Sequence, residues 1–295
     1  RAADVRSRAA SKGPPRTSRT SRARGRQPRT PARDEGTTIS LDDLEWFYPL
    51  TPPERTIVVW LPPEYESSPS RRYPVVFFAD GQNMLKDSES WSGSSWRLGE
   101  VSTALIRSRR IRPFIGVCIA NINYPGRFVE YADNPIGDTY NNWVAQTLKR
   151  AIDARFRTLP GPHNTFALGS SMGGMNALLL ALRHSDTFGA CACLSPAFQP
   201  SLVAEMALAA ASAAAASASG GSIGGGGDNA PSALSTTTRV YMDMGGDMDG
   251  AEVKVKEWFD LQRQYWGRLD NDLQGGFEAV ARTLPLAMGV DQRAV

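Results

Sequence analysis

Six short apolar runs, each closed by turn-forming residues, limit the folds that this chain can adopt. Two of them are YPVVFFADGQN at residues 73–83 and RPFIGVCIANIN at residues 112–123. Runs that are apolar without alternation are typical of strands covered on both faces, as in a parallel sheet. We therefore expect a mostly parallel sheet. Its strands would come from residues 55–65, 73–83, 112–123, 164–171, 188–196 and 238–247.

Helical patterns alternate with these runs along the chain. They lie at residues 99–110, 139–156, 172–184, 251–269 and 275–289. Strands that alternate with helices imply right-handed crossovers and a doubly wound α/β sheet with helices on both faces. Ligand sites in such sheets lie beyond the carboxyl ends of the strands, so the polar residues that follow each run are the first candidates for a site.

The first residues of the chain form a basic arm. Residues 1–33 carry ten arginines and Lys12 against Asp4, a net charge of +10, so residues 34–295 sum to −7 in a chain of net charge +3. We expect residues 1–36 to be disordered, because they bury too little apolar surface to offset the entropy of ordering them. Three interpretations stay open: an organelle transit peptide, an arm that contacts nucleic acid or membrane, and low-complexity sequence.

A second unusual segment covers residues 205–237 and consists largely of alanine, serine and glycine. Such a composition is typical of a flexible insertion. We expect residues 37–295 to form a single domain that this insertion interrupts.

Several classes of partner are disfavoured by the sequence. Cys118, Cys191 and Cys193 all lie in apolar runs without a C-x-x-C or Cys/His cluster, which favours buried reduced thiols over a disulfide or metal site. Reduced cysteines indicate a reducing compartment, so we predict an intracellular, soluble protein that is cytoplasmic or organellar. No apolar run approaches the ~18 residues of a membrane helix. Nucleic-acid binding is disfavoured because the rest of the chain is acidic and holds no recognition motif.

The clearest chemical motif is TFALGSSMGGMNALLLAL at residues 165–182, in which Gly169, Ser171 and Gly173 form G-x-S-x-G. The glycines permit a sharp turn between strand and helix that leaves the serine hydroxyl exposed above the sheet. The helix that follows directs its N-terminus at the serine, where free N–H groups favour a developing oxyanion. We therefore predict that Ser171 is a nucleophile.

An oxyanion hole needs two N–H donors in such a fold. One comes from the residue after the nucleophile, here Met172, and the other from the loop after an earlier strand. The ADGQN loop lies at that position, and either Gly81 or Gln82 is our candidate donor. A plain turn at Asp80 and Gly81 describes the same backbone and does not exclude the role.

The acid that supports a catalytic histidine should follow the serine, on a loop after a later strand. The segment VYMDMGGDMDG supplies three carboxylates, of which Asp243 falls within the strand itself. Asp249 is our first choice and Asp247 the alternative. An acidic turn without catalytic function is the remaining interpretation.

The catalytic histidine is missing from its expected place. The order in this fold is serine, acid, histidine, yet His163 and His184 both precede the acid. His163 lies eight residues before Ser171, which at ~3.3 Å per residue places it at the opposite edge of the sheet. His184 lies thirteen residues along the following helix, about 20 Å from the serine at ~1.5 Å per residue. Both are predicted to be surface residues at element ends, and neither is expected to act as the base.

These motifs together resemble the putative-esterase family of α/β-hydrolases, which includes enterochelin-esterase-like and esterase-D-like enzymes. The resemblance runs from about Arg55 to Ala197 and resumes at Arg239. It rests on YPVVFFADGQN, the tryptophans at 91 and 96, IANINYPGRFVEY, IDARFRTLP, LGSSMGGMNALLLALRHSDTFGACACLSPAF and VYMDMGGDMDG.

The resemblance implies an α/β-hydrolase fold and serine-dependent hydrolysis of a small or medium carboxylic ester, with no metal and no organic cofactor. Ser171 matches the family nucleophile, and the region from Asp247 to Asp249 matches the acid.

The resemblance also suggests residues near the substrate pocket. Arg127, Glu130 and Tyr131 match the family's R-x-x-E-Y segment, and Asp80 and Trp96 lie in other matching motifs. For Arg127 and Glu130, an ion pair that only supports the structure is an equal alternative to substrate contact.

Three departures from the family pattern accompany these matches. Gln146 replaces an expected glutamate, the insertion is atypical, and the terminal glycine-histidine segment is absent. Two hypotheses follow: an esterase whose printed sequence is a C-terminally incomplete fragment lacking its histidine, or a pseudoenzyme that keeps the fold for binding. The intact GSSMGG and acid loop favour the fragment.

Overall fold

The computed structural model describes residues 35–41, 55–122, 125–199, 201–202, 204–206, 208, 211 and 238–243. The basic arm, most of the insertion and the two last predicted helices lie outside these residues. So do Asp247 and Asp249.

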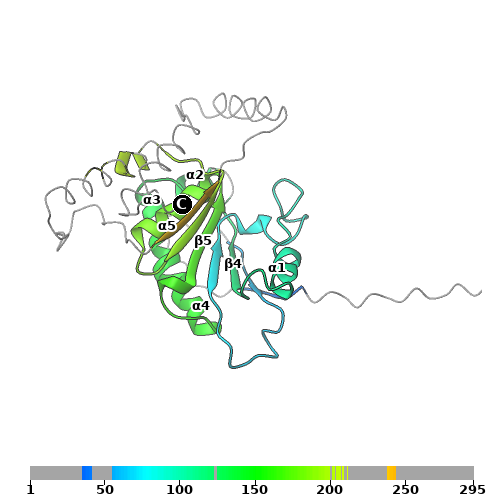
Figure 1. Cartoon of the computed structure of the whole chain (residues 1–295). Helices are drawn as coiled ribbons and strands as arrows, with labels where there is room; N and C mark the ends of the chain where they lie inside the picture. Colours follow the sequence, from blue (N-terminus) through cyan, green and yellow to red (C-terminus); the bar gives the residue numbers. More distant parts are fainter. Residues whose placement is uncertain are drawn as a thin grey trace, which may run out of the picture. The chain divides into compact units, whose positions relative to one another are not determined.

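The described residues form a seven-stranded sheet of order β1-β2-β4-β3-β5-β6-β7 (Figure 1). β2 pairs antiparallel with both of its neighbours, and the remaining pairs are parallel. The mostly parallel, doubly wound sheet predicted from the sequence is therefore confirmed. The strands are β1 (Thr37–Ser40), β2 (Ile57–Leu61), β3 (Val75–Phe78), β4 (Ile115–Ile119), β5 (Thr165–Ser170), β6 (Ala190–Leu194) and β7 (Arg239–Asp243).

Each of the six predicted runs contains one strand, but β1 was not expected. Its four residues, TTIS, are all exposed and carry no apolar run, so the sequence gives no periodic signal there. β1 forms the edge of the sheet because its backbone pairs with β2, from Thr37 opposite Leu61 to Ser40 opposite Val58. Strand formation here depends on a long-range partner rather than on local preference.

Helices connect the strands. They are α1 (Leu98–Arg107), α2 (Gly126–Glu130), α3 (Pro135–Asn142), α4 (Lys149–Arg155) and α5 (Met172–Arg183), with two 3₁₀ turns, η1 (Gly81–Asn83) and η3 (Pro162–Asn164), and a π-helical stretch, η2 (Trp143–Leu148). The helix expected over residues 139–156 is the continuous series α3, η2 and α4. It begins earlier because the Asn134 side chain accepts hydrogen bonds from the N–H groups of Ile136 and Gly137, an N-cap followed by proline.

The sheet separates two apolar cores, as alternate strand residues point to opposite faces. On one face Val59, Phe77 and Val117 pack with the buried residues of α5 and of the α3–α4 series. On the other face Trp60, Phe78 and Cys118 pack with Leu98 of α1. Figure 1 shows α1 on one side of the sheet and α3, α4 and α5 on the other. Helices therefore cover both faces, as the sequence predicted.

The strand order fixes where a ligand site can form. The chain leaves β3 through α1 to reach β4 on one side of β3, and it leaves β5 through α5 to reach β6 on the opposite side. β3 and β5 are neighbours, so the connections diverge between them, and the crevice at their carboxyl ends is the expected binding position.

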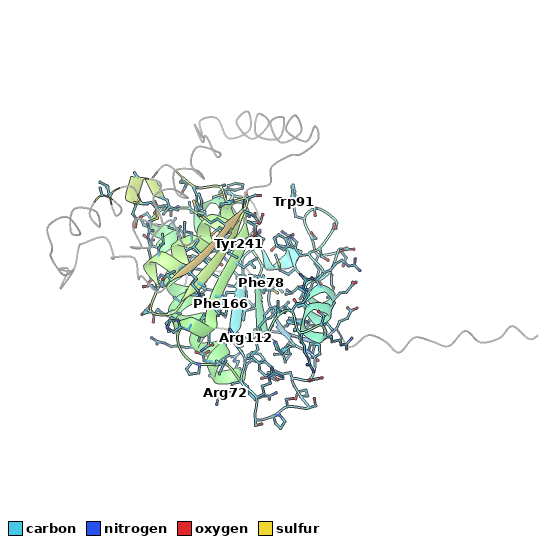
Figure 2. All side chains as sticks on the ribbon, viewed as in Figure 1. Arg72, Phe78, Trp91, Arg112, Phe166 and Tyr241 are labelled. Carbon is cyan, nitrogen blue, oxygen red and sulfur yellow. The ribbon has the colours of Figure 1, made fainter. Side chains whose placement is uncertain are left out.

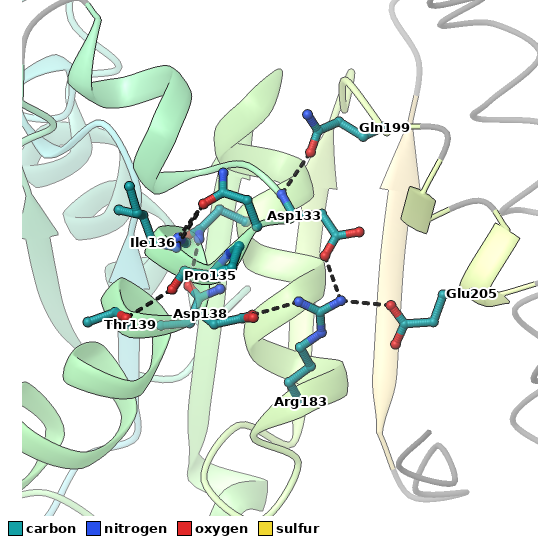
Figure 3. Close-up of polar contacts among 12 residues, drawn as sticks. Asp133, Pro135, Ile136, Asp138, Thr139, Arg183, Gln199 and Glu205 are labelled. Carbon is teal, nitrogen blue, oxygen red and sulfur yellow. Dashed lines mark hydrogen bonds and ion pairs between the residues drawn. The ribbon is translucent and has the colours of Figure 1, made fainter. Parts of the chain in front are cut away.

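One arginine joins three segments at the end of α5 (Figure 3). Arg183 donates to Asp138 of α3, to Asp133 before α3 and to Glu205 beyond β6, each at 2.7 Å. Its guanidinium is partly buried, so burial alone would lower its pKa, but the hydrogen bonds to Asp133 and Glu205 outweigh this and raise the pKa. This cluster joins the segment after β6 to the start of α3.

Among the described residues, no helix combines the length and apolar character that a membrane span requires.

We expect Arg183→Gln to lower the free energy of unfolding by about 2 kcal/mol, because it leaves three carboxylates without their shared cation in a partly buried place. Thermal and urea denaturation measure this loss. The exposed pair Lys86–Glu89 supplies the control. Lys86→Gln should change stability by less than about 0.5 kcal/mol. Equal losses in the two variants would contradict a stabilising role for the Arg183 cluster.

Candidate functional site

Ser171 occupies a strained turn between β5 and α5. Its backbone has φ 57° and ψ −126°, a region that non-glycine residues rarely adopt. Hydrogen bonds from the β6 side hold it there, since its N–H donates to the Leu194 carbonyl and its own carbonyl accepts from Ala197 N–H, both at 3.0 Å. The turn therefore has the backbone conformation of a nucleophile elbow.

The glycines around Ser171 are required by close backbone packing. A Cβ at Gly169 would lie 2.2 Å from the Gly173 carbonyl oxygen, a contact that only a backbone shift can relieve. At Gly173 the nearest atoms would be Ala79 Cβ and Asp80 Oδ2, each at 3.1 Å. The close approach at Gly173 also shows that the loop after β3 touches the first turn of α5.

Met172 is the first residue of α5, and its side chain is half-buried. The Gly174 and Met175 N–H groups donate to the Ser171 carbonyl, at 3.0 and 3.2 Å, whereas the first N–H groups of a helix have no acceptor within it. Met172 thus lies where the sequence predicted one oxyanion donor.

The second predicted donor lies on the loop that follows β3. Phe78 pairs with Leu168 in the parallel register of β3 and β5. Ala79 N–H continues this pairing by donating to the Leu168 carbonyl at 2.9 Å, and the next residue, Asp80, approaches Gly173 in the first turn of α5. Gly81 begins η1 and packs tightly on the end of β4, where an added Cβ would lie 2.3 Å from Ile119 N. The two segments predicted to supply the oxyanion donors are therefore adjacent.

Asp80 is a charged residue of this loop that is only 6% exposed. Arg127 binds its carboxylate with two parallel hydrogen bonds, Nε to Oδ1 at 2.8 Å and Nη2 to Oδ2 at 2.7 Å. Asn121 adds a third from Nδ2 to Oδ1 at 2.5 Å. Burial alone would lower the pKa of Arg127, but its hydrogen bonds and attraction to Asp80 outweigh this and raise it.

Beside that pair lies a second buried ion pair. The Arg55 guanidinium donates to Glu130, and both side chains are almost completely buried. Arg55 also donates to the Ala120 carbonyl at 3.2 Å and lies 5.1 Å from the ring centre of Tyr140. Of the two interpretations that the sequence left open for Arg127 and Glu130, the geometry favours ion pairs. Their partners are distant in sequence, since Asp80 follows β3 and Arg55 precedes β2.

Tyr131, the last of the R-x-x-E-Y residues, is fully buried. Its hydroxyl accepts a hydrogen bond from Asp80 N–H at 2.9 Å. Burial raises the pKa of Tyr131 well above its ordinary value, so the hydroxyl stays protonated. Among the described contacts, Tyr131 supports the loop from within the core.

Trp91, labelled in Figure 2, is exposed at 86%, and Trp96 is exposed at 42%. Both lie on a loop that backbone hydrogen bonds close at its base, from Trp96 N–H to the Asn83 carbonyl and from Leu98 N–H to the Met84 carbonyl. The Asn83 side chain accepts a bond from Trp91 N–H at 3.0 Å. This loop therefore continues directly from η1.

The predicted acids, Asp247 and Asp249, lie outside the described residues. β7 ends at Asp243, which confirms that this carboxylate belongs to the strand. Asp243 Oδ1 accepts from Ser195 N–H at 3.2 Å, at the same edge of the sheet as Ser171. β7 thus ends at the same edge of the sheet as Ser171, shortly before the predicted acids in the sequence.

The structure does not bring either histidine to Ser171. His163 is exposed in η3, immediately before the start of β5, and Ser171 follows the end of that strand. His184 caps the far end of α5, where its N–H donates to the Leu180 carbonyl. Burial lowers the pKa of His184, which favours its neutral form.

All three cysteines are free and buried, as predicted. Burial raises the pKa of Cys118 far above its ordinary value, so its thiol stays protonated. Within the described part of the chain, no group of three potential metal ligands occurs.

A small cavity of about 10 Å³ lies beneath the site, lined by residues of β3, β4, β5, α3 and α5 that include Tyr140 and Asn176. That volume is close to the minimum for a single water molecule, so the cavity does not accommodate an ester.

Sequence reasoning did not identify two contributors to this site, Arg55 and Asn121. Each flanks an apolar run, Arg55 before β2 and Asn121 after β4. A polar residue at the carboxyl end of a strand was a usable signal for Asn121. For Arg55 no local signal existed, because its partner Glu130 is 75 residues away.

Comparison with known proteins gives a family match. The model of a family described as "Putative esterase" matches residues 50–278. A search of curated proteins found no significant match.

Solved structures similar to the chain include enterobactin esterase from Shigella flexneri, with 18% identity and TM-score 0.47 over 58% of this chain and 41% of that one. Ferric enterobactin esterase from Salmonella typhimurium has 17% identity and TM-score 0.46, over 59% of this chain and 42% of that one. A ferulic acid esterase from Anaeromyces mucronatus has 22% identity and TM-score 0.41, over 56% and 59%. The chain thus covers less than two thirds of each of these proteins.

We expect Gly169→Ala to destabilise the protein by about 3 kcal/mol, because the new methyl group overlaps backbone rather than a movable side chain. Gly93→Ala is the control, since nothing lies within 4 Å of its added Cβ and only its φ of +73° is unfavourable. That change should cost about 1 kcal/mol. Urea denaturation compares the two, and a smaller loss at Gly169 than at Gly93 would contradict the tight elbow.

Proposed function

Because the chain belongs to the Putative esterase family, we propose that it hydrolyses carboxylic esters through an acyl-enzyme on Ser171. The observation that carries this proposal is the Ser171 backbone, held at positive φ at the junction of β5 and α5. A strained conformation that several hydrogen bonds maintain is typical of a functional residue. The expected substrate is a small or medium ester.

In the first step, Ser171 Oγ attacks the ester carbonyl carbon and loses its proton to a base. The carbonyl oxygen becomes an oxyanion, which Met172 N–H and the N–H of Gly81 or Gln82 would stabilise. The intermediate then collapses, and the leaving alkoxide departs with a proton from the base. In the second step, water attacks the acyl-enzyme in the same manner and releases the carboxylic acid.

The base is the unusual part of this proposal. Neither His163 nor His184 lies near Ser171 in the fold, and they are the two histidines among the 295 residues. We therefore propose that the natural base is a histidine that the printed sequence does not contain, oriented by Asp249 or by Asp247. Loss of such a base lowers kcat by about 10⁴-fold or more in serine hydrolases.

The test supplies the missing base from solution. Hydrolysis of p-nitrophenyl butyrate is measured for the chain and for Ser171→Ala, with and without imidazole. We expect imidazole to raise the rate of the chain at least about tenfold above that of Ser171→Ala in the same buffer, as it replaces a general base. Equal rates for the two proteins in imidazole would contradict the proposal and favour a binding protein with this fold.

Replacement of the two histidines provides a separate check. We expect His163→Ala and His184→Ala to keep the imidazole-supported rate within about twofold, since general-base effects act only within hydrogen-bond reach. A tenfold or larger loss in either variant would show that a histidine of this chain acts on Ser171.

A further inference from the structure

The Asp80 carboxylate lies between the elbow and α2 and is already bound by two other side chains. Its two oxygens accept three hydrogen bonds, two from Arg127 and one from Asn121. Its backbone has φ 55° and ψ 44°, a left-handed conformation that is uncommon for a residue with a side chain. Such a buried carboxylate is better suited to hold a loop than to bind substrate.

Asn121 joins this carboxylate to the residue predicted to be an oxyanion donor. While its side chain donates to Asp80, its own N–H donates to Gln82 Oε1 at 3.1 Å. One residue at the end of β4 thus holds both ends of the short segment that contains Gly81. The orientation of that segment is fixed by side chains from β4 and α2 together.

The helix that carries Arg127 is too short to be stable alone. α2 contains five residues, whereas isolated helices need about 12 to 15. Two ion pairs hold it, Arg127 to Asp80 and Glu130 to Arg55. The Tyr131 hydroxyl, one residue beyond α2, accepts from Asp80 N–H. Movement of α2 would therefore be passed directly to the loop after β3.

From this arrangement we propose that Arg127 and Asn121 are positioning residues, which act through Asp80 to aim the N–H group of Gly81 or Gln82 at the oxyanion of the Ser171 reaction. The inference rests on the proposed function and extends it to residues that do not contact the substrate. A donor that is displaced by a fraction of an ångström loses transition-state stabilisation while substrate binding is little changed.

The test compares kcat and KM for p-nitrophenyl butyrate in imidazole. Arg127→Gln should lower kcat at least about tenfold and leave KM within about threefold, because the donors act on the transition state. Arg127→Lys, which keeps the charge but loses the two parallel bonds, should recover part of kcat. Inhibition by butylboronic acid, which forms a tetrahedral adduct with serine, should weaken at least about fivefold in Arg127→Gln.

Arg183→Gln is the matched control. Its side chain is exposed to a similar degree, 25% against 20% for Arg127, and it also binds carboxylates by bonds of 2.7 Å, but it lies at the far end of α5. Arg183→Gln should lower thermal stability and keep kcat within about twofold, because it is remote from the reacting atoms. Asn121→Ala is a second variant for the case in which Arg127→Gln does not fold, and it should show the same selective loss of kcat.

The outcomes separate the two proposals. If Arg127→Gln and Asn121→Ala both fold and both keep a normal kcat, the positioning role is overturned and the proposed function is left standing. A parallel fall of kcat in Arg183→Gln would overturn it as well, by showing a general effect of stability. Absence of Ser171-dependent hydrolysis in the unsubstituted chain would overturn both proposals.

Discussion

The parallel pairing of β3 with β5 is the constraint on which the rest of the site depends. The two strands are distant in sequence, yet their register places the loop after β3 beside the turn after β5. Because the chain leaves them toward opposite sides of the sheet, neither connection covers the crevice between their ends. The strained backbone of Ser171 and the left-handed backbone of Asp80 occur at this one place.

Charged side chains around this crevice are used to fix the backbone. Removing a carboxylate from water is unfavourable unless it is paired and hydrogen-bonded. The Asp80 carboxylate and the fully buried Glu130 meet that requirement with arginines from α2 and from the start of β2. These pairs link three segments that the apolar cores alone do not orient. Hydrophobic packing thus positions the strands and helices, and ion pairs position the loop.

The sequence was sufficient to predict what depends on local patterns. Unbroken apolar runs predicted β2 to β7, and the glycines around Ser171 predicted the elbow, since both signals lie within a few residues. β1 and α2 were not predicted, because a four-residue strand with one apolar residue and a five-residue helix have no periodic signal. The pairing of Arg55 with Glu130 was not foreseen either, since it depends on tertiary contacts across 75 residues. The predicted acids lie beyond the described end of β7, so their role stays a prediction.

The central claim is that Ser171 forms the acyl-enzyme. Intact-mass and peptide mass spectrometry of the chain, quenched with acid after brief exposure to p-nitrophenyl acetate in imidazole buffer, tests it most directly. We predict one acetyl group on the peptide that contains Ser171, and none on that peptide in Ser171→Ala. Acetylation confined to other residues, together with hydrolysis that persists in Ser171→Ala, would contradict the account.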